Sequence, residues 1–171
     1  MTRLSLLVTG VLTAVAFALA AAVWVMSADL GRLREEEADG REALAAARLV
    51  ASDMLSYDYR TIEQDFARAG GYTTGALTEH YKKLATTLVP LAKREHMVQQ
   101  VTVAGAAVES ARSGRVEVLL FMNTGTVKTL AGEKEPRRQV SQNRARLVMV
   151  RKDSRWLVAE LSTLLGDPPP G

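Results

Sequence analysis

The stretch RVEVLLFMNTGTV at residues 115–127 decides the fold. Large apolar residues recur at every second position from Val116 to Met122. Successive side chains of a strand point to opposite faces, so this spacing predicts a strand with one face in the core and the other in water.

Three further segments predict strands beside it. They are QQVTVAGAAVES at 99–110, RARLVMV at 144–150 and RWLVAEL at 155–161. Turn residues separate the four segments at 113–114, at 132–138 and at 152–154. Parallel strands need crossovers of about a dozen residues or more, and these connections are shorter. The second half of the chain therefore predicts an antiparallel sheet of about four strands.

The residues before the sheet predict helices. Leu44, Ala47, Ala51 and Met54 recur at helical spacing, with Leu30 and Leu33 before them, which indicates a two-part amphipathic helix. We expect this apolar stripe to pack on the chain's own domain rather than on a partner helix, although self-association stays open.

Two further helices are expected upstream of the sheet. A capping box of Thr61 and Gln64 would open a short helix that ends at Gly70. The segment ALTEHYKKLATTLVPLAKRE at 76–95 follows, with an apolar face at Leu77, Tyr81, Leu84 and Leu88, and Pro90 either kinks or ends that helix. The fold class is α+β, with helices packed on one face of a curved, cone-like antiparallel sheet.

The chain begins with an apolar run. Residues 4–28 carry no charge, and about 20 apolar residues suffice to span a bilayer as a helix. Arg3 precedes the run and the mainly acidic segment 29–37 follows it, so we predict a single-pass plasma-membrane anchor with a cytoplasmic N-terminus. A signal peptide cleaved after Ala18-Leu19-Ala20 and a buried core helix are the alternatives, and the length of the run favours the anchor.

The predicted domain organisation follows from these segments. Residues 1–28 form a cytoplasmic stub and transmembrane anchor, and residues 29–165 form an extracytoplasmic α+β domain. That domain is helical over 29–95 and an antiparallel sheet over 96–165. The Pro-rich end, 166–171, is expected to be a frayed tail.

Charge is unevenly distributed in a chain whose net charge is +3. Residues 29–67 hold ten acidic and five basic residues, whereas residues 111–155 hold eleven basic and four acidic ones. Aromatic residues are scarce in the basic half and no nucleic-acid fingerprint occurs there, so we expect no nucleic-acid partner. A solvated edge, pairing with the acidic helix, and a basic surface for lipid headgroups or an acidic protein remain alternatives. The basic residues concerned are Arg137, Arg138, Arg144 and Arg146.

No chemical motif is evident. The chain has no Cys, no nucleotide-binding loop, no nucleophile elbow and no zinc motif, and neither His80 nor His96 has a second His at ligand spacing. We therefore predict no catalytic residue, no cofactor and no metal, and a protein that is not an enzyme. His80 remains a candidate polar group of a cavity, where Asp58 or Asp65 could assist it as a base.

Several segments together resemble the Mce-associated membrane proteins of actinobacteria. They are the apolar run, EALAAAR at 42–48, SYDYRTIEQDF at 56–66, Thr74-Gly75 before EHYKKL, VLLFMNT, and RWLVAEL at 155–161. The most specific part is Tyr57-Asp58-Tyr59-Arg60, which we expect to form a structural junction.

The resemblance implies a domain like nuclear transport factor 2 and like the periplasmic domain of a type IV secretion scaffold. It also implies a non-catalytic accessory subunit supporting a Mce-type complex that imports lipids, fatty acids or sterols, with Mce transporter proteins or other envelope proteins as partners. The alternatives are a carrier or enzyme with a cavity for an apolar ligand between sheet and helices, and a scaffold of another envelope or secretion machine.

Overall fold

The computed structural model describes residues 2–129 and 135–164 of the 171. Within its first helix, the side chains of 2–16, 18, 22, 25 and 28 lie outside the described set, as does the predicted tail at 166–171. In chain order the elements are helix α1 (Thr2–Leu55), strand β1 (Tyr57–Asp58), helices α2 (Ile62–Gly70) and α3 (Ala76–Arg94), and strands β2 (Val98–Arg112), β3 (Arg115–Lys128), β4 (Arg137–Lys152) and β5 (Arg155–Leu164).

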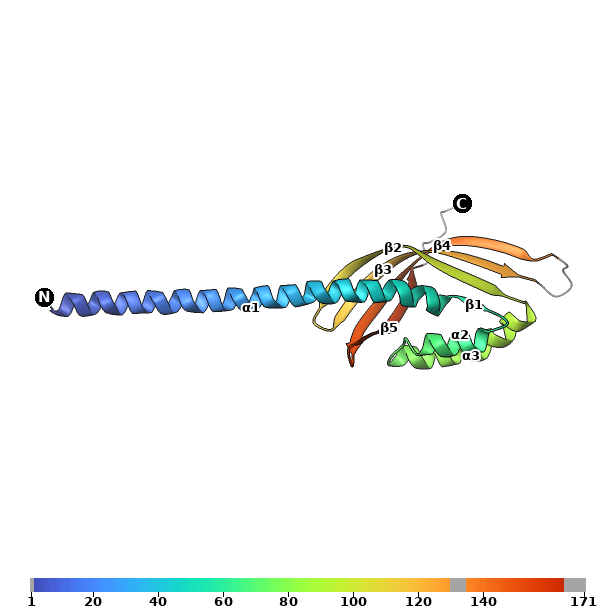
Figure 1. The fold of residues 1–171 in the computed structure, drawn as a ribbon, viewed down its shortest axis with the longest axis horizontal. Coiled ribbons are helices and arrows are strands. Elements are labelled where there is room, and N and C mark those ends of the chain that lie inside the picture. The colour runs from blue at the N-terminus through green and yellow to red at the C-terminus, as the bar shows by residue number, and fades with distance from the viewer. Residues whose placement is uncertain (1, 130–134, 165–171) are drawn as a thin grey trace. The chain divides into compact units, whose positions relative to one another are not determined.

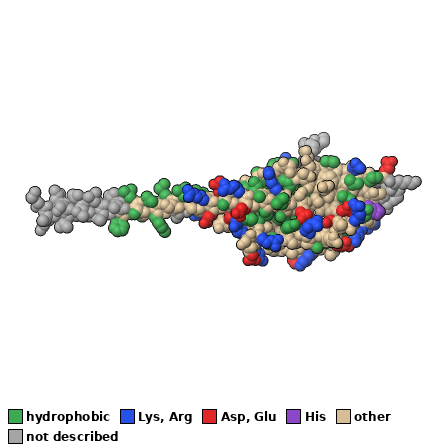
Figure 2. Space-filling model, in the orientation of Figure 1, with side chains coloured by type: hydrophobic (Ala, Val, Ile, Leu, Met, Phe, Trp, Pro, Cys, Tyr) green, Lys and Arg blue, Asp and Glu red, His purple; other side chains and the backbone are tan. Residues whose placement is uncertain are grey.

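The chain divides into two compact units, residues 1–38 and residues 39–171. The first unit is helical, and its large described apolar side chains are exposed. Phe17, Val23 and Trp24, for example, are 63–76% exposed. Figure 2 shows hydrophobic side chains on the surface of this helix. Among the residues that the structure describes, no helix is long and apolar enough to cross a membrane. Most side chains of the predicted anchor, 4–28, lie outside that described set.

The second unit is an α+β domain, as predicted. Its sheet has five antiparallel strands in the order β1-β2-β3-β4-β5, so each strand pairs with its neighbour in sequence (Figure 1). The four long strands and the turns at 113–114 and 153–154 agree with the prediction. Strand β4 begins at Arg137 instead of 144, because residues 137–143 also pair with β3. This half was not predicted, since it is mostly polar and shows no apolar alternation. The two-residue β1 was not predicted, since two residues carry no periodicity.

The core lies between the helices and one face of the sheet. On that face Val118 of β3 stands opposite Leu147 of β4, and Leu120 stands opposite Ala145; all four are fully buried. Burying a Val or Leu side chain completely contributes about 1.5–3 kcal/mol each relative to leaving it exposed. The alternation that begins at Val116 therefore supplies the sheet's share of the core.

Helix α1 contributes small residues to the same core. Ala43, Ala47 and Ala51 are fully buried, and a Cβ placed on Gly40 would lie 3.6 Å from the Ala111 side chain. Alanine and glycine allow the helix backbone to come close to the sheet. The later part of the predicted stripe, Leu44 to Met54, thus packs on the chain's own domain, as expected, whereas Leu30 and Leu33 are 51% and 58% exposed. The helix is continuous rather than in two parts.

Three local predictions about helices need correction. The Thr61 hydroxyl makes no capping bond to the backbone, because it donates instead to the Asp65 carboxylate at 2.9 Å. Pro90 lies inside α3, where little more than one turn of helix follows it, and the helix continues to Arg94. Of the predicted apolar face of α3, Leu77 and Tyr81 are buried, but Leu84 is 39% exposed.

Candidate functional site

The residues of the predicted junction connect α1 to α2 and to the start of β2. The backbone N–H of Tyr59 donates to the Met97 carbonyl at 2.9 Å, and the Tyr59 ring meets the His96 ring edge-on, with centroids 4.9 Å apart. The Tyr57 ring lies 6.4 Å from that of Phe66 on α2. Burial raises the pKa of the Tyr57 hydroxyl, so it stays protonated.

Asp58 and Arg60 form a two-bond ion pair at this junction. The Arg60 Nε donates to Asp58 Oδ1 at 2.9 Å, and Nη2 donates to Oδ2 at 2.5 Å. The side-chain and backbone hydrogen bonds from Arg60 lower the pKa of Asp58 to about 2. The carboxylate is therefore charged and paired at neutral pH, which leaves it poorly suited to act as a general base. A junction role for these residues stays a prediction.

A second carboxylate cluster holds α2 against the end of α1. Asp65 is 8% exposed and accepts hydrogen bonds from the Asp58 backbone N–H at 3.1 Å and from Arg68 Nη2 at 2.8 Å. Arg68 Nε also donates to Asp53 at 3.0 Å, and the Tyr72 hydroxyl donates to the same carboxylate at 2.7 Å. Both carboxylates are thus engaged by donors from the chain itself.

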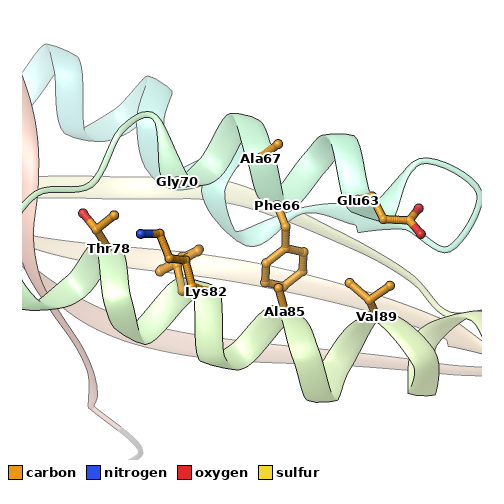
Figure 3. Close-up of a pocket in the computed structure, with 9 residues that line it drawn as sticks. Glu63, Phe66, Ala67, Gly70, Thr78, Lys82, Ala85 and Val89 are labelled. Carbon is orange, nitrogen blue, oxygen red and sulfur yellow. The ribbon is translucent and has the colours of Figure 1, made fainter.

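A mainly apolar groove with a volume of about 390 Å³ lies between α2 and α3 (Figure 3). We call it the α2–α3 groove. Phe66 reaches from α2 across to Ala85 of α3, and its ring centroid lies 6.1 Å from that of Tyr81. The lining residues are Glu63, Phe66, Ala67, Gly70, Thr78, Tyr81, Lys82, Ala85 and Val89.

Two charged residues, Glu63 and Lys82, belong to the lining of this groove, and their side chains are 60% and 68% exposed. Lys82 donates to Glu79 at 2.8 Å, and at the other end Glu63 pairs with Lys93. Burial raises the pKa of Tyr81 to about 12, so its hydroxyl remains neutral beneath the groove. Because the floor is apolar and neutral, the groove suits an apolar side chain or an acyl chain better than a charged substrate.

The structure does not join His80 to the carboxylates proposed to assist it. His80 is exposed on α3 and lines a different cleft, together with residues 159–162 of β5. Asp58 and Asp65 are bound by Arg60 and Arg68, as described above. In the described part of the chain, no group of three His, Asp or Glu side chains could hold a metal ion.

The four basic residues predicted as a surface are dispersed along β4. Arg146 binds Glu109 of β2 through two hydrogen bonds, and Arg144 lies with its guanidinium carbon 5.9 Å from the centre of the Phe121 ring. Arg137 and Arg138 are exposed at the start of the strand. Intramolecular pairing thus engages part of this charge, and a basic interaction surface stays a prediction.

The predicted pairing of basic strands with the acidic helix occurs at another residue, Arg151. Its Nη2 donates to Asp39 at 2.7 Å and to Glu42 at 2.6 Å, and its guanidinium carbon lies 4.8 Å from the centre of the Trp156 ring. Trp156 is partly buried and packs against the core.

The α2–α3 groove was missed by sequence reasoning. A signal for it exists in the small residues Ala67 and Gly70 on α2 and Ala85 on α3, which leave room between two helices. Their opposition depends on how the two helices cross, and periodicity within each helix does not give that angle.

A curated relative covers nearly the whole chain. The "Outer membrane protein Rv1973" of Mycobacterium tuberculosis (strain ATCC 25618 / H37Rv) is 29% identical over 157 residues, which is 91% of this chain and 94% of the relative.

Solved structures of low sequence identity share the fold. An IcmL-like type IV secretion system protein from Legionella pneumophila has a TM-score of 0.58 at 12% identity, covering 78% of this chain and 97% of the other. CagV, a VirB8 homolog from Helicobacter pylori, has a TM-score of 0.55 at 7% identity, covering 70% and 94%. An Ntf2-like protein involved in plasmid conjugation has a TM-score of 0.51 at 16% identity, covering 77% and 50%. The expected likeness to type IV secretion scaffold domains and to nuclear transport factor 2-like domains is confirmed at the level of fold.

Family membership rests on most of the chain. The model of the family described as "Uncharacterized protein Rv1363c/MT1408-like" matches residues 4–156. The chain therefore belongs to the Rv1363c/MT1408-like family.

Proposed function

We propose that this protein is a non-catalytic scaffold subunit of a cell-envelope assembly, whose α+β domain binds other envelope proteins. The observation that carries the proposal is a contrast within the domain. The acidic side chains that could do chemistry, Asp53, Asp58 and Asp65, are engaged by the chain's own donors, whereas the open α2–α3 groove is apolar. Such a surface supplies binding free energy without a reacting group.

The fold supports the same proposal as an analogy. Proteins named for type IV secretion systems share this domain, and a relative is named an outer membrane protein. Fold alone does not determine function, so this analogy supports a scaffold role and identifies no partner.

The proposal includes a single-pass anchor formed by residues 4–28, with the N-terminus in the cytoplasm and the domain outside. Its support is the absence of charge in this run and the position of Arg3 before it. Protease added to intact spheroplasts should degrade the domain, and N-terminal sequencing should recover the chain from its first residues. A protected domain, or a chain that begins near Ala21, would contradict the anchor.

A Mce-type lipid importer is the assembly that we propose more specifically. The support is the resemblance of SYDYRTIEQDF at 56–66 and of RWLVAEL at 155–161 to Mce-associated proteins. A tethered domain meets a partner in the same membrane at high effective concentration, so a weak interface is sufficient. Affinity capture of the full chain at native expression should recover Mce transporter components. If only other envelope proteins are recovered, the proposed scaffold role stands and the proposed Mce-type assembly is rejected.

The α2–α3 groove gives a direct test of the scaffold proposal. Ala85→Trp places an indole in the groove, whereas Thr87→Trp puts the same side chain on an exposed position of α3 outside the lining. We expect the first variant to lose the captured partners and the second to retain them, at equal expression and equal thermal stability. Equal capture by both variants would show that the groove is not the docking surface.

An apolar-ligand carrier is the second candidate, favoured by the volume and apolar lining of the same groove. Buried side chains, including those of Ala47, Leu120 and Tyr81, fill the space between sheet and helices, so the groove is the better place for such a ligand. Lipid extraction from the purified full chain, followed by mass spectrometry, should recover a bound lipid from the Thr87→Trp variant and not from Ala85→Trp. Equal lipid in both would reject the carrier.

A further inference from the structure

The part of helix α1 that precedes the domain carries an apolar line along one face. Its members recur at alternating spacings of four and three residues, and their side chains are 51–66% exposed. We call this line the 19–33 seam; it consists of Leu19, Val23, Met26, Leu30 and Leu33. Alternating spacings of three and four residues are the repeat by which two helices pack along each other. The seam is therefore shaped to receive a second helix.

Lipid accounts for only one half of this seam. Leu19, Val23 and Met26 lie within the uncharged run 4–28, where acyl chains would cover them in the proposed anchor. Leu30 and Leu33 lie beyond that run, among charged residues, and are 51% and 58% exposed. Water would surround these two leucines, so their burial against another helix is favourable.

The seam ends where the domain begins. The next two positions on the same line are Glu37 and Gly40. Gly40 is buried, and a Cβ placed on it would contact the Ala111 side chain of the chain's own sheet. Glu37 is acidic, and two copies of it would repel each other across a parallel pair. The surface available to a second helix is thus about two heptads long.

Charges beside the seam indicate which helix fits it. Leu30 occupies heptad position a and Leu33 occupies position d. Asp29 therefore takes position g and Arg34 takes position e, which flank the seam on its two sides. In a parallel pair, position g of one helix faces position e of the other helix five residues later, so Asp29 of each copy would meet Arg34 of the other. An antiparallel pair would instead place like charges together.

These two charges cannot pair within one helix. Asp29 and Arg34 are five residues apart, which places them about 140° apart around the helix. The bond of Asp29 is to Arg32 at 3.0 Å, and both side chains of that pair are more than half exposed, so the bond contributes little and can be exchanged. Arg34 is exposed as well. A second copy of the chain supplies both matching charges, whereas an acyl chain supplies neither.

We propose that the 19–33 seam binds the same seam of a second copy of this chain. The two helices form a short parallel coiled coil at the membrane surface, with Leu30 and Leu33 inside it and two Asp29–Arg34 pairs beside it. Two heptads are too short to hold a dimer in free solution, but anchors in one membrane meet at high effective concentration and with the same orientation. The inference rests on the proposed anchor and does not involve the α2–α3 groove. It gives the proposed scaffold two domains, and so two grooves, in each unit.

The first test uses the absence of Cys from the chain. The full chain with Leu30→Cys or Leu33→Cys is reconstituted at low density into phosphatidylcholine–phosphatidylglycerol vesicles and oxidised. The controls are Gly31→Cys and Glu35→Cys, which are exposed and lie off the seam; a Cβ at residue 31 meets no atom within 4 Å. We expect at least about fivefold more disulfide-linked dimer from the two seam positions than from the two controls.

The second test reverses the charges in the Leu33→Cys chain. Asp29→Arg or Arg34→Asp alone should lower the disulfide yield by about three- to tenfold, because like charges then face each other. A mixture of these two variants should regain the yield, because each copy then offers the charge opposite to that of its neighbour. Urea unfolding of the domain should be unchanged in both variants, since residues 29 and 34 are exposed.

Four results would overturn the proposal. Equal yields at all four cysteine positions, or yields that fall in proportion to added lipid, mean random collision. A mixture that does not regain the yield means that the charges do not pair between copies. A linked product of another mass in native membranes, with no dimer in vesicles of the pure chain, means that another protein's helix covers the seam. A chain that does not float with the vesicles rejects the anchor together with this inference, whereas a chain that floats without the expected pattern rejects the self-association alone.

Discussion

Replacement of Asp65 by alanine is expected to destabilise the domain by about 2–4 kcal/mol. The carboxylate accepts from three donors, namely the Asp58 N–H at 3.1 Å, the Thr61 hydroxyl at 2.9 Å and Arg68 Nη2 at 2.8 Å. Hydrogen bonds to a charged group contribute about 1.5–3 kcal/mol each, but the three are not lost in full. Thr61 can turn to water, and Arg68 keeps its bond to Asp53 at 3.0 Å.

The assay is urea unfolding of the full chain, followed by the fluorescence of Trp156. The chain has two Trp, so Trp24→Phe is used as the background for every variant. Glu79→Ala is the matched control, because its pair with Lys82 is exposed, and exposed pairs contribute less than about 1 kcal/mol. Asp65→Ala should also speed hydrogen exchange at the Asp58 amide. If Asp65→Ala lowers the free energy of unfolding by less than about 1 kcal/mol, as the control does, this carboxylate does not hold α2 in place.

Three further predictions concern the core, the junction and the turn before α3. Leu120→Ala should cost about 2–5 kcal/mol in urea unfolding, because Leu120 is fully buried, whereas Leu84→Ala, at 39% exposure, should cost clearly less. The folded pKa of Asp58 is about 2 and the unfolded value about 3.9, so its contribution to stability is present above pH ~4 and is lost as the pH falls through 2. Arg60→Ala should reduce this loss of stability at low pH, although the backbone N–H of residue 60 still donates to Asp58. Equal pH profiles of the two chains would contradict the prediction. Gly75→Ala should destabilise by about 1–3 kcal/mol, because the glycine has φ +62° and ψ −139°, and thermal unfolding that is unchanged would show that the backbone adapts.

How far the sequence predicted the fold depends on the range of the interactions involved. The alternation from Val116 to Met122 is local, and it correctly gave β3 and its buried face. Strand β1 was missed because Tyr57 and Asp58 become a strand only by pairing with Gln99 and Val98, about forty residues later in the chain. The polar half of β4 was missed for the same reason, since its pairing with β3, and not its own pattern, makes it a strand.

The candidate sites were less predictable than the fold. Residues 57–60 were expected to form a structural junction; they lie between α1 and α2, and their role stays a prediction. Sequence reasoning could not pair Arg68 of α2 with Asp53 of α1. It joined His80 to Asp58 or Asp65 on the basis of residue type alone. The contact of Arg68 with Asp53 is set by the crossing of α2 with α1, which no spacing within one helix determines, whereas Asp65 and Arg68 are three residues apart on the same helix.

The α2–α3 groove and the cleft beside β5 can be separated experimentally, and this makes the proposed scaffold role specific. They share no lining residue: the groove is lined by Phe66 and Ala85, among others, and the cleft by His80 and residues 159–162. A domain with two independent surfaces can hold two partners at once, whereas a carrier for a single apolar ligand needs only the groove. If Ala85→Trp and His80→Trp remove different sets of captured proteins, the two surfaces bridge partners. If both remove the same set by the same factor, the two sites act as one, and bridging is excluded.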